Sequence, residues 1–173
     1  MGNGLIVEAR GRRGGLALLW LRDVLVEVKS FSSHHIEAII EGRWRLVGFY
    51  GHHEVKNRRL SWALLRFLGT RLDMPTVYVG DFNKVLSRME TQGGRLRPLV
   101  QMKGLQKVVD ELGPVNLGFS GYRFTWSNNM VHPHTIKARL DRGLASTSWV
   151  ELFTKVGVKH ISCNRSDHSP VVL

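Results

Sequence analysis

The stretch Thr76-Val77-Tyr78-Val79-Gly80-Asp81-Phe82-Asn83 joins an apolar run to a glycine turn that ends in an acid and an amide. The β-branched and aromatic residues before the glycine predict a short, buried strand. Because side chains alternate along extended backbone, Asp81 and Asn83 are expected to face the same side. The stretch therefore predicts a sheet that presents two polar groups at the end of a strand.

Two later stretches place further polar residues beside apolar runs. Asp141 ends a second apolar stretch, and Asp167 and His168 precede the apolar carboxyl terminus. If each run is a strand, these side chains lie at strand ends, where an α/β fold presents polar groups to a shared pocket. We therefore expect Asp141 and His168 to converge in one pocket with Asp81 and Asn83.

These residue types match the needs of phosphodiester hydrolysis: a base for the attacking water, a donor for the phosphate oxygens and a cation. Asp81 can orient or deprotonate the water, and Asn83 can donate its amide to a phosphate oxygen. Asp141 can hold His168 in one tautomer or in its cationic form. Asp167 is then left, with Asp81, for a divalent ion, and carboxylates without a Cys-His cluster favour Mg²⁺ or Mn²⁺ over Zn²⁺. Taken singly, each acid fits a turn or a helix cap better, so the prediction depends on the combination.

Hydrophobic periodicity predicts a mixed α/β fold. Apolar or alternating segments predict strands at residues 16–20, 24–28, 35–40, 43–50, 76–80, 124–126, 136–140, 156–161 and 170–173. Apolar residues spaced by three and four predict one helix after the cap residue Asn57, ending at Gly69, and a second between Pro98 and Gly113. The capping-box spacing of Ser148 to Glu151 predicts a third, brief helix.

The chain carries 25 Lys and Arg residues against 14 Asp and Glu, a formal net charge of +11. This excess suits a polyanionic partner such as DNA and disfavours a role as an acidic protein or a carrier of small cations. Two arginine pairs are the predicted nucleic-acid contacts. Arg95 and Arg97 lie in a glycine-containing loop after the residue 76–80 strand, and Arg139 and Arg142 flank a predicted catalytic acid.

Length and composition predict one domain over residues 1–173, because 173 residues with 43% hydrophobic content suffice for one core and not for two. A single cysteine excludes an internal disulfide and fits a reducing compartment. The apolar run at residues 16–21 is too short for a signal peptide or a transmembrane span. We therefore expect a protein of the nucleus or cytoplasm, with no membrane association and no obligate protein partner.

The motifs at residues 80–83, 140–142 and 166–168 resemble the GDFN, LDR and SDH motifs of the endonuclease/exonuclease/phosphatase superfamily. Further stretches along the whole chain are similar to the endonuclease domain of plant LINE-type (non-LTR) retrotransposons: Gly14–Trp20, Gly48–Gly51, Ser61–Leu65, Gly93–Arg95, Leu117–Gly121 and Phe124–Trp126. The resemblance implies two β-sheets packed as a sandwich and flanked by helices. It also implies Mg²⁺-dependent cleavage of DNA, and it favours the nucleus.

Carried over by matching motif, the resemblance implies a role for each site residue. Asp81 is the water-activating base, Asn83 the phosphate-orienting amide, and Asp141 the partner of His168, which contacts the scissile phosphate. Asp167 matches the acid placed beside the metal or the histidine. The resemblance also implies that Tyr50 is the active-site tyrosine. The residues alone favour a core position for Tyr50, since Trp44, Leu46, Gly48 and Tyr50 alternate as in a half-buried strand.

The chain departs from the family pattern at its amino terminus. The family places an asparagine strand and a strand with the principal metal-ligand glutamate before the segment that matches Gly14–Trp20. Glu8 does not replace that glutamate, because Ala9-Arg10-Gly11-Arg12-Arg13 follows it directly. We therefore expect a domain that lacks its first strands, leaves an unpaired edge and uncovered apolar surface at residues 16–20, and has weak or absent activity.

Two alternative functions remain open. The first is a non-catalytic basic module that binds nucleic acid through the surviving part of the cleft. The second is a superfamily phosphatase that acts on lipid or inositol phosphates, which the retrotransposon-like motifs and the charge of +11 disfavour. The leading interpretation is a divalent-metal-dependent DNA endonuclease of the retrotransposon type.

Overall fold

The computed structural model describes residues 2–9, 14–71, 73–94, 100–163 and 166–173. Its central element is a six-stranded mixed sheet in the order β3-β4-β5-β6-β12-β8. The strands are β3 (Val26–Ser32), β4 (His35–Ile40), β5 (Trp44–Tyr50), β6 (Thr76–Asp81), β8 (Val115–Asn116) and β12 (Asp141–Ala145). Only the β5–β6 pair is parallel, and the other pairs in this sheet are antiparallel.

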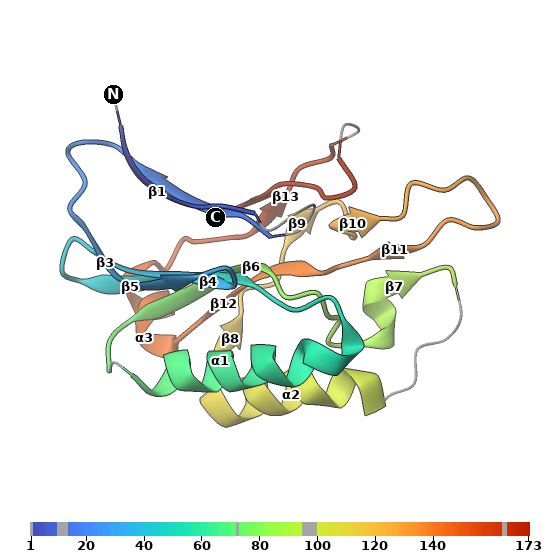
Figure 1. Cartoon of the computed structure of the whole chain (residues 1–173), viewed down its shortest axis with the longest axis horizontal. Helices are drawn as coiled ribbons and strands as arrows, with labels where there is room; N and C mark the ends of the chain where they lie inside the picture. Colours follow the sequence, from blue (N-terminus) through green and yellow to red (C-terminus); the bar gives the residue numbers. More distant parts are fainter. Residues whose placement is uncertain (1, 10–13, 72, 95–99, 164–165) are drawn as a thin grey trace.

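Three smaller sheets accompany the central one. Their strands are β1 (Asn3–Val7) with β2 (Leu16–Trp20), β10 (Trp126–Ser127) with β11 (Lys137–Ala138) and β7 (Thr91–Gln92), and β14 (Val171–Val172) with β13 (Lys159–His160) and β9 (Ser120–Gly121). Figure 1 shows β1, β9, β10 and β13 on one side of the central sheet and the two long helices on the other. The layers therefore confirm the predicted α/β class, with sheets packed together and flanked by helices.

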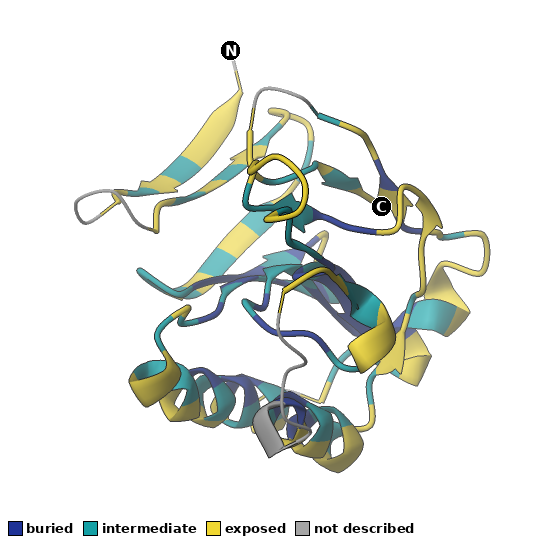
Figure 2. Cartoon of the chain, turned by 90° about the vertical axis from the view of Figure 1, so that its right-hand side faces the viewer, coloured by how far each residue is buried: buried dark blue, intermediate teal, exposed yellow. Residues whose placement is uncertain are grey.

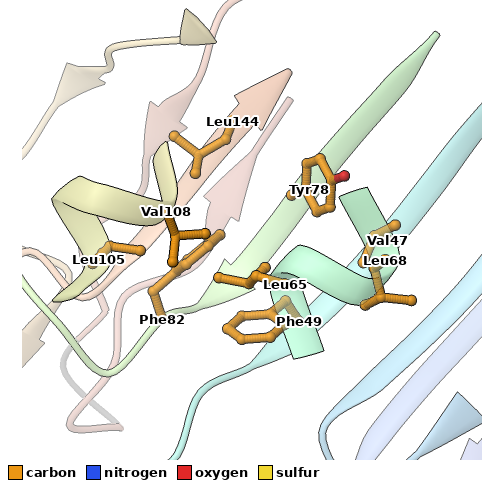
Figure 3. Close-up of a cluster of buried hydrophobic side chains, with 9 residues drawn as sticks. All are labelled: Val47, Phe49, Leu65, Leu68, Tyr78, Phe82, Leu105, Val108 and Leu144. Atoms are coloured by element: carbon orange, nitrogen blue, oxygen red, sulfur yellow. The ribbon is translucent and has the colours of Figure 1, made fainter. Parts of the chain in front are cut away.

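The hydrophobic core lies between the central sheet and the helices α1 (Arg58–Thr70) and α2 (Val100–Leu112). Both helices turn a buried side toward the sheet and an exposed side toward solvent (Figure 2). Figure 3 shows the buried side chains that meet there, which are Val47, Phe49, Leu65, Leu68, Tyr78, Phe82, Leu105, Val108 and Leu144. Because strand side chains alternate, this layer leaves the opposite face of β5 and β6 for the smaller sheets and the polar residues.

Local details differ from the sequence-based expectations at two helix starts. Asn57 occupies the cap position of α1, but its side chain donates to Glu54 and caps no backbone group. The short helix α3 (Thr147–Leu152) is capped by Ser146, two residues before the predicted Ser148, because the Ser146 hydroxyl accepts the Trp149 N–H at 3.2 Å. The expected end of α2 at a glycine is observed, whereas Pro98 lies outside the described residues.

The β1–β2 hairpin was only partly predicted. Strand β1 was not expected, and it pairs with β2 from Asn3↔Trp20 to Val7↔Leu16, so one edge of β2 is covered. No further strand pairs with the hairpin among the described residues. Ile6 is 71% exposed and Leu19 70% exposed, so the expected uncovered apolar surface is present on its outer face. No described helix is both long enough and apolar enough to cross a membrane.

We expect Leu68→Ala to lower the free energy of unfolding by about 3 kcal/mol, since Leu68 is fully buried and its truncation leaves a cavity. Leu60→Ala on the same helix is the matched control, because Leu60 is 51% exposed, and it is expected to change stability by less than about 0.5 kcal/mol. Urea unfolding followed by circular dichroism measures both. Equal effects of the two substitutions would contradict the placement of α1 on the sheet.

Candidate active site

The ends of three neighbouring strands place the site. Asp81 is the last residue of β6, and its register partners are Asp141 on β12 and Tyr50 on β5. Residues in register on adjacent strands project to the same face, so both carboxylates point to one side of the sheet. Gly80 permits the close approach of β6 to β5 just before Asp81. Its φ is +141°, and a Cβ there would lie 2.2 Å from the Phe49 carbonyl oxygen.

Asn83 fixes the carboxylate of Asp81. Its backbone N–H donates to Asp81 Oδ1 at 2.7 Å, and its side-chain Nδ2 donates to Asp81 Oδ2 at 2.8 Å and to the Gly51 carbonyl at 2.7 Å. Both hydrogens of the Asn83 side-chain amide are thus bound within the protein. Because both partners are acceptors, the amide atom that faces them is the nitrogen. In this arrangement Asn83 orients Asp81, and donation to a phosphate oxygen requires one of these bonds to be released.

His168 and Asp141 form a hydrogen-bonded pair. His168 Nδ1 lies 2.9 Å from Asp141 Oδ2, and His168 Nε2 lies 3.9 Å from Asp81 Oδ2. Because a carboxylate only accepts, Nδ1 carries the proton, and Nε2 lies on the side of Asp81. The structure therefore brings Asp81, Asn83, Asp141 and His168 together from three segments of the chain.

Thr125 supports this arrangement and was not identified from the sequence. Its hydroxyl accepts the N–H groups of Leu140 at 2.9 Å and Asp141 at 3.0 Å, which holds the start of β12. The next residue, Trp126, forms an isolated β-bridge with His168. The sequence predicts a strand at residues 124–126 and a resemblance there, but no spacing rule identifies a threonine whose hydroxyl holds the start of another strand.

Burial and like charge perturb the acids and the histidine. Burial, followed by repulsion from Asp141, raises the pKa of Asp81 to about 7. Burial lowers the pKa of His168, but the hydrogen bond and charge of Asp141, with the charges of Asp81 and Asp167, outweigh this and raise it. Near neutral pH the site thus combines a carboxylate that readily accepts a proton with an imidazole that readily keeps one.

Tyr50 lies beside this group of residues. Its side chain and Asp81 line one cavity of about 320 Å³, whose opposite wall comes from β2. The His34 ring stacks on the Tyr50 ring with centroids 5.9 Å apart, and His34 Nδ1 lies 2.8 Å from the Tyr50 carbonyl oxygen. Tyr50 therefore faces the site and is half-buried, and its catalytic role stays a prediction.

Asp167 does not join the other acids. It is exposed, and its Oδ2 accepts the indole N–H of Trp126 at 3.3 Å. Its charge still acts on His168, whose pKa it helps to raise. Among the described residues, the ligand atoms of Asp81, Asp141 and His168 lie close enough together to hold one metal ion, and Asp167 lies outside this group, so its role as a metal ligand stays a prediction.

Arg139 and Arg142 do not reach a DNA surface. Arg142 is 1% exposed and Arg139 is 7% exposed, and both guanidinium groups bind Glu90, at 3.0 Å and 2.6 Å. Arg142 also donates to the Lys84 carbonyl at 2.9 Å. Buried ion pairing therefore replaces the predicted phosphate contact at these two positions. Arg95 and Arg97, the other predicted pair, lie outside the described residues.

A divalent cation fits the group formed by Asp81, Asp141 and His168. One ligand atom from each of these residues lies within 4.8 Å of the others. Two neighbouring carboxylates also provide the hard oxygen donors that Mg²⁺ and Mn²⁺ prefer. Their mutual repulsion, which contributes to the raised pKa of Asp81, is the kind of cost that a bound cation offsets.

Residues 3–168 match the model of the Endonuclease/Exonuclease/phosphatase family, and the chain belongs to this family. Its members' fold agrees with the arrangement of sheets and helices described above. No curated protein sequence matches the chain.

Solved structures share the fold at low sequence identity. The endonuclease domain of TRAS1, a telomere-specific non-LTR retrotransposon, has a TM-score of 0.72 and 15% identity, over 98% of this chain and 78% of that chain. The 3′ phosphatase NExo from Neisseria, bound to a product DNA hairpin, has a TM-score of 0.70 and 18% identity, over 98% and 77%. Truncated TDP2 from Caenorhabditis elegans has a TM-score of 0.56 and 19% identity, over 99% and 74%.

We expect Asp81→Asn to stabilise the fold at high pH. The pKa of Asp81 in the folded protein, about 7, exceeds its ordinary value of 3.8, so the folded state loses stability as pH rises from about 4 to about 7. Asparagine removes this cost but accepts only one of the two Asn83 hydrogen bonds. The effect of the substitution is therefore expected to be more favourable at pH 8 than at pH 4, by on the order of 4 kcal/mol.

Urea unfolding at the two pH values measures this difference. Asp110→Asn, an exposed position on α2, is the control and is expected to change stability by less than about 0.5 kcal/mol at both. A loss of stability at pH 8 in Asp81→Asn would show that the hydrogen bonds of Asp81 outweigh its burial and the repulsion by Asp141.

Proposed function

We propose that this protein is a divalent-metal-dependent DNA endonuclease of the retrotransposon type, with weak activity. The observation that carries the proposal is the convergence of Asp81, Asp141 and His168, with Asn83 bound to both oxygens of Asp81. Family membership supports hydrolysis of a phosphodiester or phosphomonoester bond. The likeness to a retrotransposon endonuclease domain and to a DNA 3′ phosphatase favours DNA as the substrate.

The side chains divide the work of hydrolysis. Asp81 orients the attacking water and takes a proton from it as the water oxygen bonds to phosphorus. His168, held through Nδ1 by Asp141, directs Nε2 to a phosphate oxygen and donates to it in the cationic form that its raised pKa favours. The bond from phosphorus to the leaving sugar oxygen breaks, and that oxygen takes up a proton from solvent.

Asp81 and Asp141 would hold the metal ion in this proposal. When bound, a divalent cation supplies positive charge that neutralises the phosphate oxygens as the transition state forms. Two carboxylates leave most coordination positions of Mg²⁺ to water, which is the reason we expect weak activity. Asp81, Asp141 and His168 have the roles in this proposal that the sequence predicts. Asn83 is assigned to orienting Asp81, and Tyr50 is proposed to line the substrate side.

The proposal predicts slow nicking of supercoiled plasmid DNA in Mg²⁺ that stops when EDTA is added. Asp81→Asn and His168→Ala are each expected to reduce the rate by on the order of a hundredfold or more, because each removes a group that contacts the reacting atoms. Asp110→Asn is the matched control and should nick at the wild-type rate. Gel conversion of supercoiled to open-circular plasmid measures the rate.

The outcomes separate the proposal from its alternatives. Nicking that survives Asp81→Asn would remove this site from the reaction. DNA binding without nicking by the wild-type protein would favour the non-catalytic nucleic-acid-binding module. Release of phosphate from lipid or inositol phosphates, without nicking, would favour the phosphatase.

Binding to a plain DNA duplex should be salt-sensitive and tolerant of sequence. The formal charge of +11 motivates this prediction, although the burial of Arg139 and Arg142 removes two of the cations from the surface. A protein that neutralises about three phosphates loses on the order of fiftyfold in affinity between 50 and 200 mM salt. Fluorescence anisotropy over that range measures the slope. An affinity that does not change with salt would contradict binding through phosphates.

A further inference from the structure

Two histidines lie beside the candidate active site and take no part in the proposed hydrolysis. The His34 and His52 rings lie against each other, with centroids 3.8 Å apart and planes inclined by 33°. His34 immediately precedes β4, His52 follows β5, and both are half-buried. The fold therefore brings together two imidazoles from separate segments, in a place where solvent and ligands can reach them, and the charge of such a pair depends on pH.

The central sheet places His34 in line with the catalytic acids. Asp141, Asp81 and Tyr50 are register partners on β12, β6 and β5. The Tyr50 N–H donates to the His34 carbonyl at 2.9 Å, which continues this row by one more segment. Cross-strand neighbours project to the same face of a sheet, so the four side chains follow one line across the strand ends. Adjacent strands are about 4.8 Å apart, which puts the His34 backbone about 10 Å from that of Asp81.

The hydrogen bond of His34 determines what its other ring nitrogen can bind. His34 Nδ1 lies 2.8 Å from the Tyr50 carbonyl oxygen, and since a carbonyl oxygen only accepts, Nδ1 carries a proton. In the neutral ring Nε2 is then an acceptor, which cannot bond to the oxygens of a phosphate diester because these are acceptors too. Nε2 becomes a donor only when the ring takes up a second proton. A phosphate can therefore bind His34 Nε2 only together with a proton.

His52 is held against His34 by its backbone. Its N–H donates to the hydroxyl of Ser61, a buried residue of α1, at 2.7 Å. The preceding residue, Gly51, accepts the side-chain amide of Asn83, so the same segment touches the catalytic group. Burial, followed by repulsion from His34, lowers the pKa of His52. His52 thus disfavours a charge in the free protein, and two rings this close together readily carry only one added proton between them.

The surroundings of the pair provide little negative charge. Among the residues that the structure describes, the titratable groups that face it are His35, Tyr50, His53 and Glu54. Glu54 is the acid in this set, and its carboxylate also accepts the Asn57 amide at 2.9 Å. A bound anion is therefore the partner that can balance a proton on the pair.

We propose that His34 and His52 bind a DNA phosphate near the scissile one and take up one proton as they do so. A strand that runs along the row carries one phosphate per about 3.4 Å of helix axis, so a second phosphate reaches the pair while the scissile phosphate lies beside Asp81 and His168. DNA binding is then tighter at lower pH. This inference rests on the proposed function, because it takes the scissile phosphate to lie at the catalytic group.

The test measures binding of a fluorescent plain DNA duplex at pH 8 and pH 6, by anisotropy in EDTA and at constant ionic strength. A shift of one pKa unit on binding corresponds to about a tenfold change in affinity. The wild-type protein is expected to gain about tenfold more affinity from pH 8 to pH 6 than His34→Gln or His52→Gln, because glutamine takes up no proton. Asp81 and His168 also titrate in this range, but their contribution is common to all three proteins and cancels.

His53→Gln is the matched control. His53 is exposed, adjacent to His52, and its Nε2 lies 3.7 Å from Glu54 Oε1, which balances its charge without DNA. It should keep the wild-type gain. His52→Lys carries a positive charge at both pH values, so it should bind more tightly than the wild-type protein at pH 8 and gain less at pH 6. Circular dichroism at both pH values shows that each variant is folded, and the two separate glutamine variants keep the test valid if one of them is not.

An equal gain in the wild-type protein and in the folded glutamine variants would overturn the inference, and so would a loss of affinity that is the same at pH 8 and pH 6. Because binding is measured without metal, this outcome is separate from the failure of the proposed function. Absence of Mg²⁺-dependent nicking would overturn the endonuclease proposal, whereas nicking by a protein whose DNA binding takes up no proton at this pair would overturn only the role of the two histidines.

Discussion

The register of β6 between β5 and β12 is the constraint on which the candidate site depends. It sets Asp81 opposite Asp141 and beside Tyr50. A slip by one residue would turn the Asp81 side chain to the helix side, where the core leaves no room for a charge. The core itself holds the register, since Phe49 and Phe82 pack with ring centroids 5.0 Å apart. Stability and function are therefore linked at this strand end.

The site keeps two carboxylates together at an electrostatic cost, and the surrounding chain limits that cost. Asn83 donates twice to Asp81, and Asp141 binds His168, so neither charge lacks a partner. The buried Arg142 adds a positive charge that lowers the pKa of Asp81 in part. The positive charge of Arg142 thus acts inside the fold, on Glu90 and on Asp81.

Hydrophobic periodicity predicted β4, β5, β6 and the two long helices because these elements bury one face against a common core. It predicted helix starts less well, since neighbouring polar residues compete for the same cap. Helix α3 is capped by Ser146 and not by Ser148, because the Ser146 hydroxyl accepts the backbone N–H of Trp149. At the start of α1, the Asn57 side chain donates to Glu54 and does not cap the helix. Strand β1 was missed because Asn3–Val7 is short and contains a glycine.

The sequence by itself determined which residues end strands and which chemical groups they carry, because strand periodicity and glycine turns are local properties of the chain. Only the tertiary structure decided which of these groups meet. Asp81 and Arg142 have the same local signature, a charged residue beside an apolar run, yet one faces the candidate site and the other is buried against Glu90. The difference arises because burial and pairing depend on elements distant in the chain, and no local pattern specifies them.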